Sequence, residues 1–165
     1  MKEIYMWVDW FSELSRKIAH NDEQYLVNKA KEINWNREGN EPKLLAYGDE
    51  CIDPFSFLNT LVSYNRHSSQ RMRVFPHVSQ LFDISTNLPN LADENAFVFP
   101  TTDPRRRILF FSRDNRNPTC LWKLFRNAVD ELNHVNPTDF DEAMKIDRVS
   151  IGKLSQVLFL ISSCP

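Results

Sequence analysis

The stretch Asp53-Pro54-Phe55-Ser56-Phe57-Leu58-Asn59-Thr60-Leu61-Val62 contains the clearest helix start in this chain. The carboxylate of Asp53 can accept a hydrogen bond from the free N–H groups of a helix that begins directly after it. Pro54 suits the first helical position, where no N–H is needed. The stretch therefore predicts a helix whose buried face consists of Phe55, Leu58, Leu61 and Val62.

The same pattern of a capping residue followed by periodic apolar residues recurs along the chain. Asn117-Pro118 and Asn136-Pro137 each predict a helix start, and Asn21-Asp22 and Ser150 are further candidate caps. Pro76 predicts the start of a short helix that continues through Leu81 and Phe82. An additional helix near the beginning is indicated by apolar residues at spacings of three and four, namely Trp7, Trp10, Phe11, Leu14 and Ile18.

The irregular stretch from Ile84 to Asn117 contains two short runs rich in aromatic and branched residues. These runs are Phe97-Val98-Phe99 and Ile108-Leu109-Phe110-Phe111, and two prolines lie between them. They allow a small β-hairpin with a long connection. No repeat or linker divides the chain, so the fold class that we expect is mainly α, a single helical domain over residues 1–165 with this hairpin as its one β element.

Composition excludes several classes of protein. The chain has 165 residues, of which three are glycines, Gly39, Gly48 and Gly152. A P-loop and a dinucleotide-binding fingerprint both need closely spaced glycines, so neither is present. There is no apolar run long enough to span a membrane, and the first residues lack the apolar core of a signal peptide. Together with three widely spaced cysteines, these features predict reduced thiols and a cytoplasmic location.

The net charge of −2 hides an uneven distribution along the chain. Residues 66–126 carry 10 basic and 5 acidic side chains, whereas both flanking regions are acidic. Most of the basic residues are arginines, which suit bidentate contacts with phosphate or with the edge of guanine. The candidate nucleic-acid-binding residues form two clusters, the first Arg66, Arg71 and Arg73, the second Arg105, Arg106, Arg107, Arg113 and Arg116.

Both arginine clusters are expected in loops or at hairpin ends, where side chains can reach a partner. An alternative interpretation is that these arginines pair with nearby Asp and Glu or simply keep the surface soluble. The four tryptophans could stack on a base, but three of them have the spacing of core residues, and packing is the better explanation.

The sequence shows no sign of a catalytic, metal or cofactor site. The histidines His20, His67, His77 and His134 have no ligand spacing between them. Asp49 and Glu50 could join Asp53 in a carboxylate group, but helix capping explains Asp53 better. We therefore expect a non-catalytic protein without a metal or cofactor.

Four motifs in order and spacing resemble the N-terminal region of McrB-like AAA+ GTPases of modification-dependent (type IV) restriction systems. The motifs are Trp10-Phe11-x-Glu13-Leu14-x-x-Lys17-Ile18, Tyr47-Gly48-Asp49-Glu50-x-Ile52-Asp53-Pro54-Phe55-Ser56-Phe57, Leu121-Trp122-Lys123-Leu124-Phe125-Arg126 and Lys153-Leu154-Ser155-Gln156-x-Leu158-Phe159-Leu160-Ile161. In that family this region precedes the GTPase motor and generally recognises modified DNA, and the motor recruits a nuclease subunit.

The resemblance implies a non-catalytic DNA-recognition domain of a defence system, whose partner is DNA, modified or unmodified, and whose arginine clusters contact the backbone. It places no ligand residues of the family on this sequence. The alternative is a protein-interaction domain that docks onto a nuclease subunit or another component of the defence system, since the acidic ends and apolar helices fit that role equally well.

Overall fold

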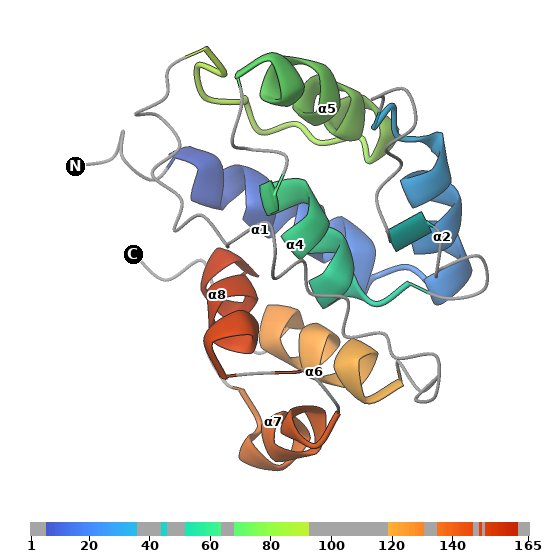
Figure 1. The fold of residues 1–165 in the computed structure, drawn as a ribbon, viewed down its shortest axis with the longest axis vertical. Coiled ribbons are helices and arrows are strands. Elements are labelled where there is room, and N and C mark those ends of the chain that lie inside the picture. The colour runs from blue at the N-terminus through green and yellow to red at the C-terminus, as the bar shows by residue number, and fades with distance from the viewer. Residues whose placement is uncertain are drawn as a thin grey trace.

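The computed structural model describes residues 6–35, 44–45, 52–63, 68–92, 119–130, 135–146, 149 and 151–161. Within these ranges the chain is a single all-helical domain of seven helices without a strand (Figure 1), which confirms the predicted fold class. The two runs of the expected β-hairpin lie outside the described residues. The helices are α1 (Met6–Ala19), α2 (Glu23–Glu32), α4 (Pro54–Ser63), α5 (Ser68–Leu81), α6 (Thr119–Asp130), α7 (Pro137–Met144) and α8 (Ile151–Ile161).

Helix α1 occupies the middle of the molecule, with α5 on one side and α6, α7 and α8 on the other (Figure 1). It packs directly against α6 and α8, and α4 also packs against these two helices. None of the helices among the described residues has the length and apolar character that crossing a bilayer requires.

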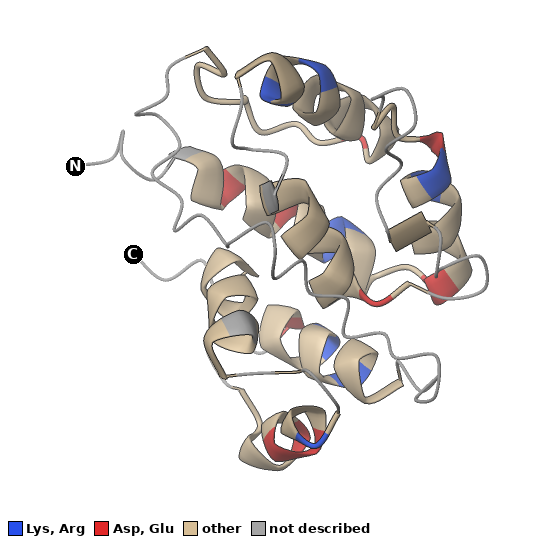
Figure 2. Cartoon of the chain, in the orientation of Figure 1, with Lys and Arg blue, Asp and Glu red and all other residues tan. Residues whose placement is uncertain are grey.

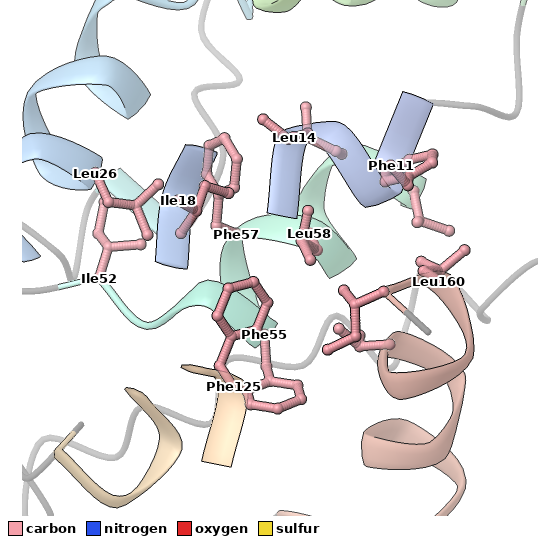
Figure 3. Close-up of a cluster of buried hydrophobic side chains, with 14 of the residues drawn as sticks. Phe11, Leu14, Ile18, Leu26, Ile52, Phe55, Phe57, Leu58, Phe125 and Leu160 are labelled. Atoms are coloured by element: carbon pink, nitrogen blue, oxygen red, sulfur yellow. The ribbon is translucent and has the colours of Figure 1, made fainter. Parts of the chain in front are cut away.

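The core lies where α1, α4, α6 and α8 meet (Figure 3). Phe55 of α4 packs edge-on against Phe125 of α6, with ring centroids 5.7 Å apart. Burial of one such large apolar side chain stabilises the fold by about 1.5–3 kcal/mol. The apolar stripes predicted for α1 and α4 are confirmed, because every residue in them is at most 4% exposed: Trp7, Trp10, Phe11, Leu14, Ile18, Phe55, Leu58, Leu61 and Val62.

Three of the predicted helix starts are confirmed by the residues that the structure describes. Helix α4 begins at Pro54, and Asp53 accepts hydrogen bonds from the N–H (2.9 Å) and the hydroxyl (2.5 Å) of Ser56. Asn136 caps α7 ahead of Pro137, and Asp22 caps α2. The predicted caps at Asn117-Pro118 and Ser150 lie outside the described residues.

The prediction that Pro76 begins a helix is wrong. Helix α5 starts at Ser68 and continues through Pro76 to Leu81. A proline inside a helix removes the N–H that would bind the carbonyl four residues earlier, which here belongs to Met72. Both Pro76 and Met72 are exposed, so water can satisfy that carbonyl, and the helix tolerates the interruption.

Candidate nucleic-acid interface

Six of the eight candidate arginines lie outside the described residues, so their contact with DNA stays a prediction. These six are Arg66, Arg105, Arg106, Arg107, Arg113 and Arg116. The other two, Arg71 and Arg73, lie on α5, a helix with no acidic residue along its length (Figure 2).

The structure does not combine these two arginines into one cationic surface. Arg71 is only 3% exposed, and its Nε donates a hydrogen bond to the carbonyl of Leu91 over 3.0 Å. Arg73 is half-buried, and residues two positions apart point to different sides of a helix. Because Arg71 would have to leave its site to reach a phosphate, we leave it out of the proposed interface.

All four tryptophans belong to the core, which confirms the prediction from spacing for Trp7, Trp10 and Trp122 and adds Trp35. Trp10, Trp35 and Trp122 are each at most 4% exposed. Their indole N–H groups donate to Ser79 Oγ (2.8 Å), to the Ala30 carbonyl (2.7 Å) and to the Ile52 carbonyl (3.2 Å), respectively. Trp7 is 2% exposed. In this conformation none of the four presents a ring face on which a base could stack.

The described part of the chain contains no group of three His, Cys, Asp or Glu side chains that could hold a metal ion. His77 Nδ1 accepts the N–H of Asn34 over 3.0 Å, so this ring joins α5 to the end of α2. His20 Nδ1 lies 2.8 Å from the carbonyl of Arg16 one turn earlier. Asp53 acts as a helix cap, and Cys120 is a free thiol whose pKa is raised by partial burial.

The most elaborate polar arrangement involves residues 83–92, which we call the strap. Its first residue, Asp83, has φ 51°, and the N–H of Ile84 bonds to the carbonyl of Ser79 over 2.9 Å. This geometry is a Schellman motif, which ends a helix by turning the chain through a left-handed residue. Figure 1 shows that the strap then runs back beside α5.

Glu13 on α1 holds the strap through four hydrogen bonds, which we call the Glu13 clamp. Its Oε1 accepts the N–H (2.8 Å) and the hydroxyl (2.9 Å) of Ser85. Its Oε2 accepts the N–H (2.8 Å) and the hydroxyl (2.5 Å) of Thr86. One carboxylate thus satisfies two backbone donors that belong to no helix.

The clamp strongly favours the ionised form of Glu13. Partial burial by itself raises the pKa of Glu13. The four hydrogen bonds lower it, the one from the Ser85 N–H most, and together they outweigh burial and hold the pKa at about 2. The clamp therefore remains charged throughout the physiological pH range.

A second attachment lies near the far end of the strap. There Arg71 donates to the carbonyl of Leu91, as described above. Between the two attachments Pro89 is buried, and Ile84, Leu88 and Leu91 pack against the core. The strap is thus held by one charged side chain at each end and by apolar contacts between them.

The residues that carry the long-range polar contacts were not predicted to do so. Besides Glu13 they include Asp139 of α7, which accepts from Lys123 Nζ (2.6 Å) and Asn127 Nδ2 (2.7 Å) of α6. Arg126 likewise donates to the carbonyls of Ala19 and Asn21 at the end of α1. Glu13 and Arg126 are positions of the quoted motifs, but a charged residue on a helix gives no indication of a partner that is distant in sequence.

The chain belongs to the family described as "Domain of unknown function (DUF8425)", whose model matches residues 7–163. No curated protein and no solved structure matches it.

Proposed function

We propose that this member of the DUF8425 family is a non-catalytic DNA-recognition domain. The observation that carries the proposal is the group of five arginines within twelve residues, Arg105, Arg106, Arg107, Arg113 and Arg116, in a chain whose net charge is negative. Arginine is well matched to phosphate because its planar guanidinium can donate two parallel hydrogen bonds. A local cationic segment allows an otherwise acidic protein to bind a polyanion without binding every acidic surface.

The finer part of the proposal is that the domain acts in a McrB-like restriction system and reads modified DNA. Its support is the resemblance of the four motifs, one of which includes the Asp53 cap and the Pro54 helix start. Because the family description carries no function, this part of the proposal depends on the resemblance alone.

The test replaces Arg105, Arg106 and Arg107 together with Ala and measures binding to labelled duplexes, methylated and unmethylated, across a range of salt concentrations. If each arginine contacts one phosphate, the slope of log K against log salt becomes shallower by about 2.7, at about 0.9 per contact. We expect affinity at low salt to fall by about tenfold or more.

A matched control removes three positive charges elsewhere. Arg16, Lys31 and Lys145 are exposed and lie on α1, on α2 and at the end of α7. Their combined replacement with Ala changes the net charge equally but should leave the salt slope unchanged. Equal slopes for the two triple variants would contradict the assignment of the Arg105–Arg107 cluster.

A second candidate function, docking onto a protein partner such as a nuclease subunit, is favoured by a feature of α8. Ile151 and Phe159 are 62% and 50% exposed, although both are large and apolar. They lie eight residues apart, which places them on one side of the helix, and among the side chains that the structure describes between them the exposed ones are the small Gly152 and Ser155. Apolar residues grouped in this way are typical of a contact surface.

A further inference from the structure

One side of α5 is open to solvent, and we call it the outer face of α5. It consists of four exposed residues and the half-buried Arg73, which recur at spacings of three and four and therefore lie together on the helix surface. These residues are Ser69, Met72, Arg73, Pro76 and Gln80. Figure 1 shows α5 at one end of the molecule.

The outer face carries a single charge, which is positive. Helix α5 has no acidic residue, and the nearest one along the chain, Asp83, lies 3.8 Å from Lys17 Nζ. Arg73 forms no hydrogen bond or ion pair with any group that the structure describes, and its Nε is buried without an acceptor. Arg71, in contrast, is held by the carbonyl of Leu91. Arg73 would therefore gain hydrogen bonds by turning outward to a partner that supplies acceptors.

Two further residues of the outer face differ from what contact with water alone requires. Met72 is large and apolar but 51% exposed. Pro76 interrupts the hydrogen bonding of α5 at an exposed position, where its ring gains little burial to offset the loss. Departures from local sequence rules that bring the folded chain no gain of its own are expected at functional sites.

We propose that α5 enters the major groove of DNA, where Arg73 binds a guanine and Met72 and Pro76 contact the C5 methyl group of a neighbouring pyrimidine. This inference rests on the proposed function. Arginine donates two hydrogen bonds to N7 and O6 of guanine, and apolar side chains contact the C5 methyl group of thymine. The same methyl group occupies the same position in 5-methylcytosine.

The form and charge of α5 favour DNA as the partner. Its 14 residues span about 21 Å, and the major groove, about 12 Å wide, admits one α-helix. Because α5 has no carboxylate, it would bring no negative charge against the phosphates that border the groove. Ser69 and Gln80, toward the two ends of the outer face, add uncharged groups that can bind phosphates or base edges.

The experiment selects bound DNA from duplexes with a randomised central segment and sequences it, for the wild type and two variants. Arg73→Lys keeps the positive charge but loses the planar pair of donors. The wild type should enrich sites in which a guanine adjoins a thymine, and Arg73→Lys should reduce the preference for that guanine by about 5- to 150-fold. Met72→Ala should reduce the preference for the thymine by about fourfold, the effect of one buried methyl group.

The selected site then distinguishes the two sources of the methyl group. Deoxyuridine in place of the thymine removes only the methyl group, and wild-type affinity should fall about fourfold. Met72→Ala should be less sensitive to this replacement. Tighter binding to 5-methylcytosine than to cytosine at the same position would show that the methyl group is read on a modified base as well. Equal affinity of the wild type for thymine and deoxyuridine would overturn the methyl contact.

Lys145→Ala is the matched control, because it removes one positive charge at the end of α7, on the opposite side of α1 from α5 (Figure 1). It should keep the wild-type base preferences. Wild-type protein that binds DNA without base preference, or variants of α5 that keep the wild-type preferences, would overturn the role of α5 alone, and its exposed Met and Arg would then suit a protein partner. Wild-type protein that binds no duplex would instead overturn the proposed function on which this inference rests.

Discussion

Asp53 combines two environments that act on its carboxylate in opposite directions. It caps α4 with hydrogen bonds from Ser56, which favour the ionised form. Its side chain is also fully buried, and the loss of hydration raises the pKa to about 6 in spite of those hydrogen bonds. Ionisation of this buried capping residue therefore destabilises the fold, whereas an exposed capping carboxylate ionises without loss of hydration.

This conflict predicts that stability decreases between about pH 4 and pH 6. The folded-state pKa of about 6 exceeds the ordinary value of 3.8, so in this interval the folded protein binds more protons than the unfolded chain. Stability must then fall as pH rises, on the order of 1–3 kcal/mol, and stay constant above pH 6 with respect to this group. Urea unfolding measured at intervals from pH 4.5 to 7.5 would show it.

Asp53→Asn isolates the contribution of this carboxylate. Asparagine is an equally good cap and cannot ionise. The variant should therefore lack the decrease between pH 4.5 and 6, and at pH 7 it should retain the stability that it has at pH 4.5. Asp53→Ala, which removes the cap as well, should be less stable by about 1 kcal/mol at pH 4.5. An undiminished pH dependence in the asparagine variant would show that another group titrates.

The pKa of Glu13 shifts in the opposite direction to that of Asp53, so the two carboxylates change the stability of the fold in different pH ranges. Its folded pKa of about 2 lies below the ordinary value of 4.5, so the stability that it contributes is complete above pH 4.5 and is lost as pH falls toward 2. Protonation of Glu13 thus limits stability in acid, whereas ionisation of Asp53 limits it nearer neutrality.

At the scale of helices, local patterns were sufficient to predict most of what the structure describes. A capping side chain and a proline at the first position are local signals, and they predicted the starts of α4 and α7 correctly. Pro76 carries only the second part of this signal, because the residue before it is Phe75, which cannot cap a helix, and it lies in the middle of α5. The proline alone was therefore a poor indication of a helix start, and the buried residues Val74 and Phe75 before it belong to the same helix.

Pro76→Ala should stabilise the protein. Alanine restores the N–H that can bind the carbonyl of Met72 and favours a helix interior by up to about 3 kcal/mol. The unfolded chain gains up to about 1 kcal/mol of flexibility when proline is removed, so the expected net gain is about 1–2 kcal/mol. Urea denaturation measures it, and Gln80→Ala, at an exposed position of the same helix, serves as a near-neutral control. A net loss of stability would mean that the packing of Phe75 and Val78 requires the proline.

Polar contacts between helices could not be predicted in the same way. Glu13 meets its partners 72 and 73 residues away, and Arg126 meets Ala19 and Asn21 more than 100 residues away. A single sequence shows which residues can donate or accept hydrogen bonds, but it does not show which of them lie close together in the folded protein. The candidate site shows the same limit, since Arg71 has the residue type expected of a phosphate contact but is buried by tertiary structure.

Across the whole domain, the strap and the exposed apolar residues of α8 lie in different regions. The strap is attached to α1 and α5, whereas the exposed apolar residues belong to α8. In Figure 1 α5 and α8 lie on opposite sides of α1. The proposed DNA contact uses Arg105, Arg106 and Arg107 and the proposed protein contact uses Ile151 and Phe159, so variants of one set should not affect binding through the other.

The exposed side of α8 supplies the corresponding test. If the domain docks onto a nuclease subunit through α8, as the second candidate function proposes, replacement of both Ile151 and Phe159 with Ser should abolish that binding, measured by titration calorimetry with the purified subunit. Ile151 is 62% exposed, and Phe159 is 50% exposed but also contacts Trp7 of α1 with ring centroids 6.2 Å apart, so the protein should lose about 1 kcal/mol of stability and stay folded. The control changes two exposed polar residues of the neighbouring helix region, Asp141→Ser with Lys145→Ser, and should bind like the wild type. DNA affinity should be the same in all three proteins, because none of the replaced residues belongs to the arginine clusters. A subunit that binds the α8 variant as tightly as the wild type would exclude this surface, and DNA binding lost in the same variant would show that the two regions are not independent.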